Sequence, residues 1–247
     1  MIKNIKIIFA YDGSDFSGVQ TQKGLSSVQE EIEKAILKIT NKKSRLIVAG
    51  RTDAGVHAFG QVANFLTNTN IPADAFKYHL NKHLPDGILI TDSCEMDLSF
   101  HSRFSAKSKL YRYIVYNDEF MHPNLRKIYA HVTYKLDVDM MNDAAKLLEG
   151  KHDFKAFTKY ENREVNTIRS IDRINIYRQD KLIYFEFEAE SFLYNQVRIM
   201  VGTLINIGRG HREVEYIIEL LESKDRLKAG MTITPYGLYL INISYWL

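Results

Sequence analysis

Apolar and polar residues alternate with a period of two in several segments, which predicts strands that bury one face. We predict strands over residues 2–11, 45–49, 61–66, 88–93, 110–116, 170–178, 182–189 and 239–246. Apolar residues spaced three and four apart predict helices over residues 28–39, 73–84, 138–149, 195–207 and 213–223. Strands and helices that mix in this way along the chain indicate the α+β class.

Capping residues locate the beginnings of two helices. Ser26 and Ser27, with Gln29 and Glu30 three residues after each, form a capping-box pattern. Asp137 is suited to the N-cap of the helix over 138–149, and a glycine follows that segment at its expected end.

Each half of the chain contains strands, a helix and further strands, and no Pro/Ser-rich linker separates the halves. We therefore expect an N-terminal half over residues 1–105 and a C-terminal half over residues 106–247. The expected fold is two similar α/β halves that share a largely antiparallel, mixed central sheet with helices packed on it.

Composition narrows the class of protein. Hydrophobic residues make up 45% and charged residues 26% of the 247 residues, which excludes a disordered or low-complexity chain. Cys94 is the one cysteine, so neither an intramolecular disulfide nor a cysteine-based zinc site can form, and we expect a reducing, cytoplasmic location. Residues 229–247 carry no charge, but their glycines, proline and threonines favour a loop and a strand over a membrane span.

Basic residues concentrate in one part of a chain whose net charge is only +3. Residues 101–135 contain seven lysines and arginines against two acids. The basic residues are Arg103, Lys107, Lys109, Arg112, Arg126, Lys127 and Lys135. This stretch indicates either a face that meets a polyanion or a solvated strand edge protected by lysines.

Motifs for bound cofactors are absent from the sequence. It contains no phosphate-binding glycine loop, no dinucleotide fingerprint after the first strand and no His-Glu-x-x-His pattern. His79 and His83 lie four apart on an expected helix, but they have no acidic or third ligand nearby. We therefore expect chemistry that requires neither metal nor cofactor.

Asp53 is the foremost candidate for chemistry, because it lies in a tight glycine-punctuated connection between two expected strands. The nearby Arg51 favours an ionised carboxylate, as a nucleophile requires. The alternative is a turn aspartate that binds its own backbone.

Two further segments each allow two interpretations. Arg198 lies in an otherwise apolar helix, where it either pairs with a carboxylate or extends to the surface. The segment 109–113 alternates lysine or arginine with tyrosine, notably Tyr111, which suits either RNA stacking or a strand with its tyrosines turned inward.

Six segments, taken in order, resemble the tRNA pseudouridine synthase A (TruA) family over nearly the whole chain. The resemblance rests on residues 11–20 (YDGSDFSGVQ), 50–58 (GRTDAGVHA), 109–113 (KLYRY), 149–157 (EGKHDFKAF), 192–202 (FLYNQVRIMVG) and 235–240 (PYGLYL). It implies the pseudouridine synthase fold, no cofactor or metal, and a cytoplasmic homodimer. The implied reaction is isomerisation of uridine to pseudouridine in the tRNA anticodon stem-loop, around nucleotides 38 to 40.

The resemblance also implies roles for four residues. Asp53 is the expected nucleophile, and Arg198 the arginine that pairs with it. Tyr111 is expected to stack on the flipped base and is the candidate for removing the C5 proton. Arg51 is expected beside the extruded nucleotide.

One departure from the family pattern bears on which uridine is modified. Val19 stands where the family usually has tryptophan. The alternatives left open are a pseudouridine synthase for another RNA and an RNA-binding protein without catalysis. A glycosidase-like hydrolase would need a second carboxylate as its acid, and the sequence offers no obvious partner for Asp53.

Overall fold

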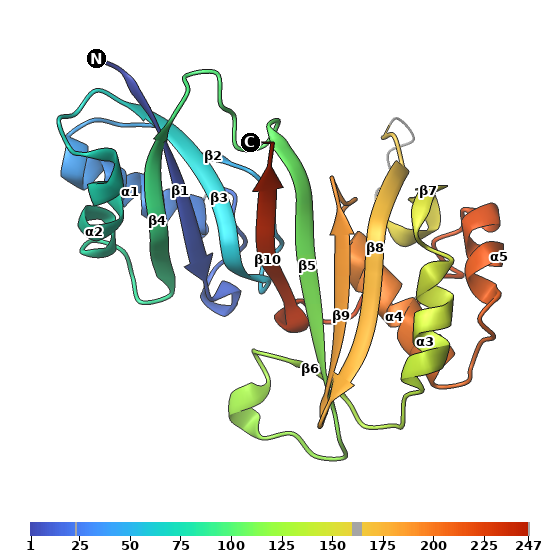
Figure 1. The fold of residues 1–247 in the computed structure, drawn as a ribbon. Coiled ribbons are helices and arrows are strands. Elements are labelled where there is room, and N and C mark those ends of the chain that lie inside the picture. The colour runs from blue at the N-terminus through green and yellow to red at the C-terminus, as the bar shows by residue number, and fades with distance from the viewer. Residues whose placement is uncertain (23, 160–164, 247) are drawn as a thin grey trace. The chain divides into compact units, whose positions relative to one another are not determined.

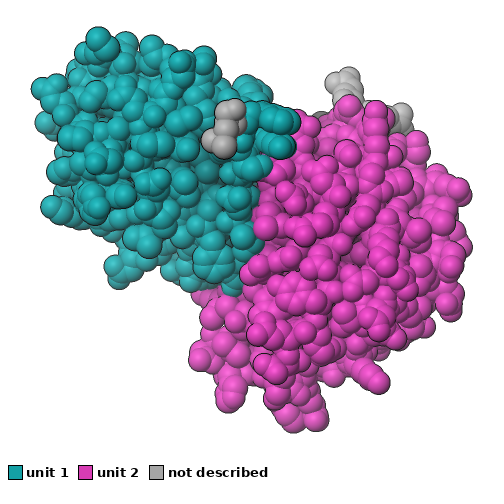
Figure 2. Space-filling view, in the orientation of Figure 1, with its two compact units in different colours: residues 1–107, 239–247 teal, residues 108–238 magenta. Residues whose placement is uncertain are grey.

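The computed structural model describes residues 1–22, 24–159 and 165–246. It divides into two units (Figure 2): unit 1 comprises Met1–Lys107 and Tyr239–Leu247, and unit 2 comprises Ser108–Leu238. Both units combine mostly antiparallel sheet with helices, which confirms the predicted α+β class. No helix within the described residues is both long and apolar enough to cross a membrane.

The sheet of unit 1 follows the order β4–β1–β3–β10, with β2 also paired to β3 (Figure 1). These strands are β1 (Lys3–Tyr11), β2 (Ile47–Val48), β3 (His57–Thr67), β4 (Ile88–Met96) and β10 (Leu238–Tyr245). β1 is antiparallel to β3 and β4, whereas β10 runs parallel to β3. The alternating apolar residues Ile5, Ile7 and Phe9 of β1 are fully buried, as their spacing predicts.

Helix α1 (Val28–Thr40) begins where the capping pattern predicts. The Ser27 side chain is its N-cap and accepts a hydrogen bond from the Glu30 backbone amide. The second predicted helix divides into a 3-10 turn over Ala73–Ala75 and the short helix α2 (Phe76–Asn81). Phe76 of α2 packs edge-on against Phe65 of β3, so this helix covers the apolar face of the sheet.

Unit 2 contains the strand order β5–β9–β8–β7, and β6 pairs in parallel with β5. The strands are β5 (Ala106–Asn117), β6 (Ala130–Val132), β7 (Gly150–Asp153), β8 (Ile168–Gln179) and β9 (Leu182–Ala189). β5–β9, β8–β9 and β7–β8 are antiparallel pairs, so the predicted hairpin over 170–189 is confirmed.

The helices of unit 2 are α3 (Val138–Lys146), α4 (Gln196–Gly208) and α5 (Tyr216–Ser223). Asp137 caps α3 as predicted, and its side chain accepts from the Met140 amide. Single 3-10 turns complete the described elements at Gly13–Asp15, Pro123–Leu125, Phe154–Phe157 and Pro235–Gly237.

The last strand groups differently from our expectation. The division expected at residue 105 placed 239–247 in the C-terminal half, whereas Tyr239–Leu247 cluster with unit 1. The reason is pairing: Tyr239 lies in register with His57 of β3. A period-two pattern predicts that a segment is a strand but carries no information about its partner.

Candidate active site

Asp53 lies on the connection between β2 and β3, residues 49–56, called here the Asp53 loop. Its side chain is half-exposed, Arg51 is exposed, and Thr52 between them is buried. The amide of Val56 donates to the carbonyl of Asp53 at 3.2 Å, which closes a tight turn just before β3. The loop therefore presents Asp53 from the rigid start of a strand.

Buried polar side chains from neighbouring strands hold this loop in place. The hydroxyls of Tyr11 and Thr52 share a hydrogen bond of 2.6 Å. Gln61, fully buried, accepts from the amide of Gly50 at 3.3 Å and donates to its carbonyl at 2.9 Å. Burial raises the pKa of Tyr11 to about 12, although hydrogen bonds to Thr52 and Gln61 oppose the shift, so its hydroxyl stays neutral.

The N-terminal Tyr-Asp-Gly segment packs directly against the Asp53 loop. The amide of Gly55 donates to the carbonyl of Gly13 at 3.2 Å. A Cβ at Gly13 would lie under 3.0 Å from the Val56 carbonyl oxygen, closer than real Cβ atoms approach. The amide of Val19 donates to the Thr52 carbonyl at 3.3 Å. Residues 11–20 therefore support the Asp53 loop, so the first two segments of the family resemblance pack against each other.

His57, the first residue of β3, links the loop to the C-terminal strand. Its ring stacks on Tyr239 with 4.7 Å between centroids, and Tyr239 stacks on Phe59 at 5.3 Å. Its Nδ1 lies 3.2 Å from the Gly13 amide and 3.1 Å from Asp12 Oδ1. A neutral imidazole accepts at Nδ1 from the amide, whereas a protonated one pairs with the carboxylate.

We expect Gly13→Ala to lower both stability and activity. The new methyl group meets backbone rather than a mobile side chain, so the chain segment that carries Asp53 must shift. We predict a clear drop in melting temperature and a loss of kcat/KM of at least about tenfold, since small displacements of catalytic groups are costly. Ser14→Ala is the matched control. Equal activity of both variants would contradict the supporting role of Gly13.

In unit 2, the tyrosines of the 109–113 segment point inward. Tyr111 of β5 is 8% exposed and meets Phe192 edge-on at 5.3 Å between centroids. Tyr113 is fully buried, and its hydroxyl donates to the Thr234 carbonyl at 2.6 Å. Burial raises the pKa of Tyr113 far above its usual range, with the nearby charge of Arg198 opposing the shift. Tyr113 is thus a structural residue.

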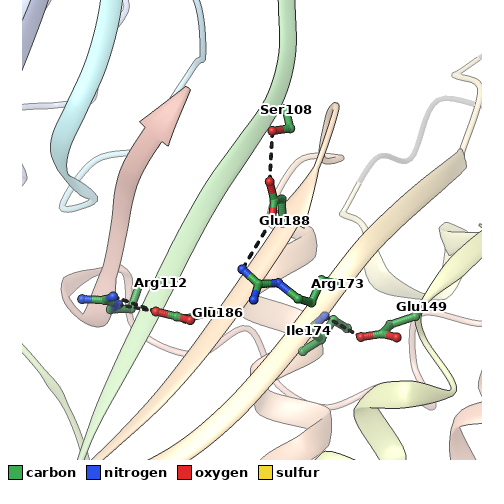
Figure 3. Close-up of polar contacts among 7 residues, drawn as sticks. All are labelled: Ser108, Arg112, Glu149, Arg173, Ile174, Glu186 and Glu188. Atoms are coloured by element: carbon green, nitrogen blue, oxygen red, sulfur yellow. Dashed lines mark hydrogen bonds and ion pairs between the residues drawn. The ribbon is translucent and has the colours of Figure 1, made fainter. Parts of the chain in front are cut away.

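The other face of the same sheet carries paired charges (Figure 3). Arg112 of β5 binds Glu186 of β9 at 2.6 Å, and Glu188 contacts both Ser108 at 3.2 Å and Arg173 of β8 at 3.5 Å. Because Glu186 neutralises Arg112, this cation of the basic stretch adds little to any attraction for a polyanion.

Arg198, half-buried on α4, is held by groups of its own unit. Its Nε donates to the Ile233 carbonyl at 2.8 Å, and its Nη1 donates to Asn195 Oδ1 at 2.7 Å. These two bonds fix the plane of the guanidinium. Arg51 and Asp53 belong to unit 1, and Tyr111 and Arg198 to unit 2. The pairing of Asp53 with Arg198 stays a prediction.

A close backbone crossing positions the loop that binds Arg198. A Cβ at Gly202 of α4 would lie under 3.0 Å from the Met231 carbonyl, and the Gly230 amide donates to Thr203 Oγ1 at 2.9 Å. Arg226 then binds the carbonyl of Gly230 at 3.0 Å. Helix and loop therefore form one rigid support for the Arg198 side chain.

Sequence reasoning assigned no role to several of these supporting residues. Tyr11, His57 and Tyr239 lie within the segments that carry the family resemblance, so their positions were flagged although their contacts were not. The contact of Asn195 with Arg198 was missed in the same way, since Asn195 lies within the segment 192–202. Gln61 gave no signal, because its bonds to the backbone of Gly50 are not visible in one sequence. Within the described residues, no group of three or more histidine, cysteine or acidic side chains is placed to hold a metal ion.

Comparison with known proteins identifies the family. A family model described as tRNA pseudouridine synthase matches residues 7–105 and 144–246. Proteins named tRNA pseudouridine synthase A from Acetivibrio thermocellus and Finegoldia magna are 46% and 47% identical over 244 residues, each covering 99% of this chain and 100% of the relative.

A solved structure of an H/ACA RNP bound to a substrate RNA containing 2'-deoxyuridine matches with a TM-score of 0.38 and 12% identity, over 72% of this chain and 39% of that one. That similarity is too weak to bear on function. The sequence relatives and the family model, in contrast, each extend over most of both units. The chain therefore belongs to the tRNA pseudouridine synthase family, a family of isomerases.

Proposed function

We propose that this protein isomerises uridine to pseudouridine in the tRNA anticodon stem-loop, around nucleotides 38 to 40, with Asp53 as nucleophile. The observation that carries the proposal is the Asp53 loop, which buried hydrogen bonds from Tyr11 and Gln61 hold at the start of β3. Family membership supplies the reaction class, and this loop supplies a pre-organised carboxylate for it.

In the reaction, the N1–C1' bond is replaced by a C5–C1' bond, and a proton is lost from C5 while N1 gains one. The carboxylate of Asp53 attacks either C1' of the ribose or C6 of the uracil, and the glycosidic N1–C1' bond breaks. The uracil then turns so that C5 faces C1', and a C5–C1' bond forms. The C5 proton leaves to a base, N1 gains a proton, and the Asp53 adduct is released. Atoms and electrons balance without an oxidant or cofactor.

Tyr111 is the proposed stacking partner and proton acceptor. Its ring is fixed by the edge-on contact with Phe192, which suits a rigid surface for a flipped base. Extrusion of a base from the stack costs a few kcal/mol, which stacking on this ring offsets.

The two arginines are proposed to act through charge. Arg198, oriented by Ile233 and Asn195, pairs with Asp53 and keeps that carboxylate ionised. Arg51 is exposed beside Asp53 on the same loop and contacts the extruded nucleotide. Both roles follow the family resemblance of the segments that contain them.

The choice of target and the assembly are further parts of the proposal. We propose a cytoplasmic homodimer that holds tRNA across both subunits, in line with the family resemblance. Val19 is fully buried, and its backbone amide donates to the Thr52 carbonyl, so the Asp53 loop adjoins a residue smaller than the family's tryptophan. This supports a second candidate function: the same isomerisation at another uridine.

Mapping of modified positions tests the proposal. Unmodified tRNA transcripts are incubated with the protein, and pseudouridine is located by selective chemical labelling and primer extension. We expect modification around nucleotides 38 to 40. Modification confined to another position or another RNA would support the second candidate, and its absence from all RNAs tested would contradict both.

Tyr111→Phe separates stacking from proton transfer. The variant keeps the ring and its contact with Phe192 but loses the hydroxyl. We predict that the rate of pseudouridine formation falls about 10²–10⁴-fold, as for the loss of a general base. Binding of tRNA, measured by filter retention, stays within about threefold. An unchanged rate would restrict Tyr111 to stacking.

A further inference from the structure

The connection from β4 to β5, residues 97–105, is fixed by buried polar side chains. Asn4, Asn64 and Ser102 are at most 3% exposed. Asn4 donates to the Asp97 carbonyl at 2.9 Å, and the Ser102 amide donates to Asn64 Oδ1 at 2.9 Å. Buried polar groups cost free energy unless they are paired, and these pair with the backbone of the connection. The network thus imposes one conformation on a surface segment.

Two exposed aromatic rings, each accompanied by a cation, lie at the end of this segment and directly after β10. Phe104 is 77% exposed, with Arg103 Cζ 5.7 Å from its centroid. Trp246 is 74% exposed, with Lys107 Nζ 4.4 Å from its centroid. His101 stacks on Phe104 at 4.3 Å, and its Nδ1 accepts from the amides of Arg103 and Phe104. We call these five residues the Phe104–Trp246 platform.

Tyr245 joins the two parts of the platform, because its hydroxyl donates to the Ser102 carbonyl at 2.8 Å and Trp246 follows it directly. His57 and Tyr239 pair beside the Asp53 loop. Along β3, Asn64 lies seven residues beyond His57, and along β10, Tyr245 lies six residues beyond Tyr239. At about 3.3 Å per residue, the platform lies on the order of 20 Å along the strands from the Asp53 loop. Figure 1 shows the end of β10 beside the connection from β4 to β5.

We propose that the Phe104–Trp246 platform binds RNA, with unpaired bases stacked on the two rings and phosphates paired with Arg103 and Lys107. Single exposed aromatic residues are ordinary. Two rings with adjacent cations on a pinned segment match the chemistry of single-stranded RNA binding, which combines stacking surfaces with positive charge. Within the strand 109–113, Tyr113 is fully buried and offers no exposed ring of this kind.

This inference rests on the proposed function, because it assigns the platform to the same RNA at a point several nucleotides from the reacting uridine. One RNA that spans about 20 Å contacts both the platform and the Asp53 loop. The platform then contributes affinity and register rather than chemistry.

Alanine substitutions test the stacking. Affinity for an unmodified tRNA transcript is measured for Phe104→Ala, Trp246→Ala and the double variant. We expect the Kd to rise about tenfold for each and about a hundredfold for the double variant. Phe120→Ala is the matched control, because Phe120 is also 77% exposed but lies in unit 2; its Kd stays within about twofold. Melting temperatures stay near the wild-type value, since the rings are exposed.

The cations are tested by salt dependence. The double variant Arg103→Gln and Lys107→Gln loses two phosphate contacts, so the slope of log Kd against log salt falls by about 1.4 to 1.8. If the slope of log Kd against log salt in this variant equals that of the wild-type protein, the proposed phosphate contacts of Arg103 and Lys107 are overturned. Wild-type Kd in the Phe104/Trp246 double variant, or equal weakening by Phe120→Ala, would overturn the platform.

The same variants separate this inference from the proposed function. If the wild-type protein forms pseudouridine and the platform variants bind tRNA normally, the platform alone is overturned. If the wild-type protein binds tRNA through the platform but forms no pseudouridine, the proposed function alone is overturned. Dissociation of a dimer by the variants, with unchanged RNA affinity, would make the platform a protein interface and overturn the inference.

Discussion

Replacement of Asp53 by asparagine is expected to reduce pseudouridine formation by at least about 10⁴-fold. Asparagine has nearly the same shape but its amide is not a nucleophile, so no covalent adduct forms. Asp53 is half-exposed at the start of β3, and the hydrogen bond from Val56 to its carbonyl does not depend on the side chain. We therefore expect the fold and the melting temperature to be retained.

Binding of tRNA distinguishes a catalytic from a structural aspartate. In Asp53→Asn the Kd for tRNA should be unchanged or slightly lower, because one negative charge near the RNA backbone is removed. Asp74→Asn, an exposed carboxylate in the same unit, is the matched control and should keep wild-type activity. Loss of binding together with activity would make Asp53 a structural residue, and retained activity would exclude it as nucleophile.

Gly202→Ala is expected to destabilise the protein although alanine favours helices. Helix propensity alone predicts a gain of about 1 kcal/mol in a helix interior. The added methyl group, however, would lie too close to the Met231 carbonyl, which is backbone and cannot turn aside as a flexible side chain can. Overpacking of this kind typically costs about 1–3 kcal/mol, occasionally more, so we predict a net loss of free energy of unfolding.

The matched control lies in the same helix. A Cβ at Gly208 would lie 2.6 Å from the Met141 side chain and 3.1 Å from the Asp137 carbonyl oxygen. Its nearest contact is therefore a side chain rather than backbone, so Gly208→Ala should cost less than Gly202→Ala. The Gly202 variant should also lose activity, since the displaced loop carries the Ile233 carbonyl that binds Arg198. Urea unfolding and pseudouridine formation measure the two effects. An increase in stability of about 1 kcal/mol would show that the crossing relaxes without cost.

Helix starts were predictable because their signals are local. Ser27 and Asp137 each cap a helix three residues from the amide that they bind, so spacing alone reveals them. Strands β6 and β7 were not predicted, since they are only three and four residues long and β7 contains no apolar alternation. The partner of β10 was unpredictable for a different reason: pairing joins positions far apart in the chain.

In the candidate site, too, local features were predictable from the sequence and contacts between distant segments were not. The glycine-rich connection around Asp53 was visible as a loop between strands, and its position is confirmed. The support from Gly13 and Gln61 depends on contacts between distant segments, which one sequence does not contain. For the segment 109–113, the structure buries the Tyr113 ring and pairs Arg112 with Glu186, which alternation alone did not reveal. The stacking role of Tyr111 stays a prediction.

The central claim is that this chain exchanges the N1–C1' bond of a tRNA uridine for a C5–C1' bond. Because substrate and product have equal mass, the direct measurement is tritium release from an unmodified tRNA transcript labelled at C5 of uridine, with pseudouridine counted in the same sample. We predict one tritium released for each pseudouridine formed by the wild-type protein. Folded protein that binds the transcript without release, or release without pseudouridine, would contradict the account.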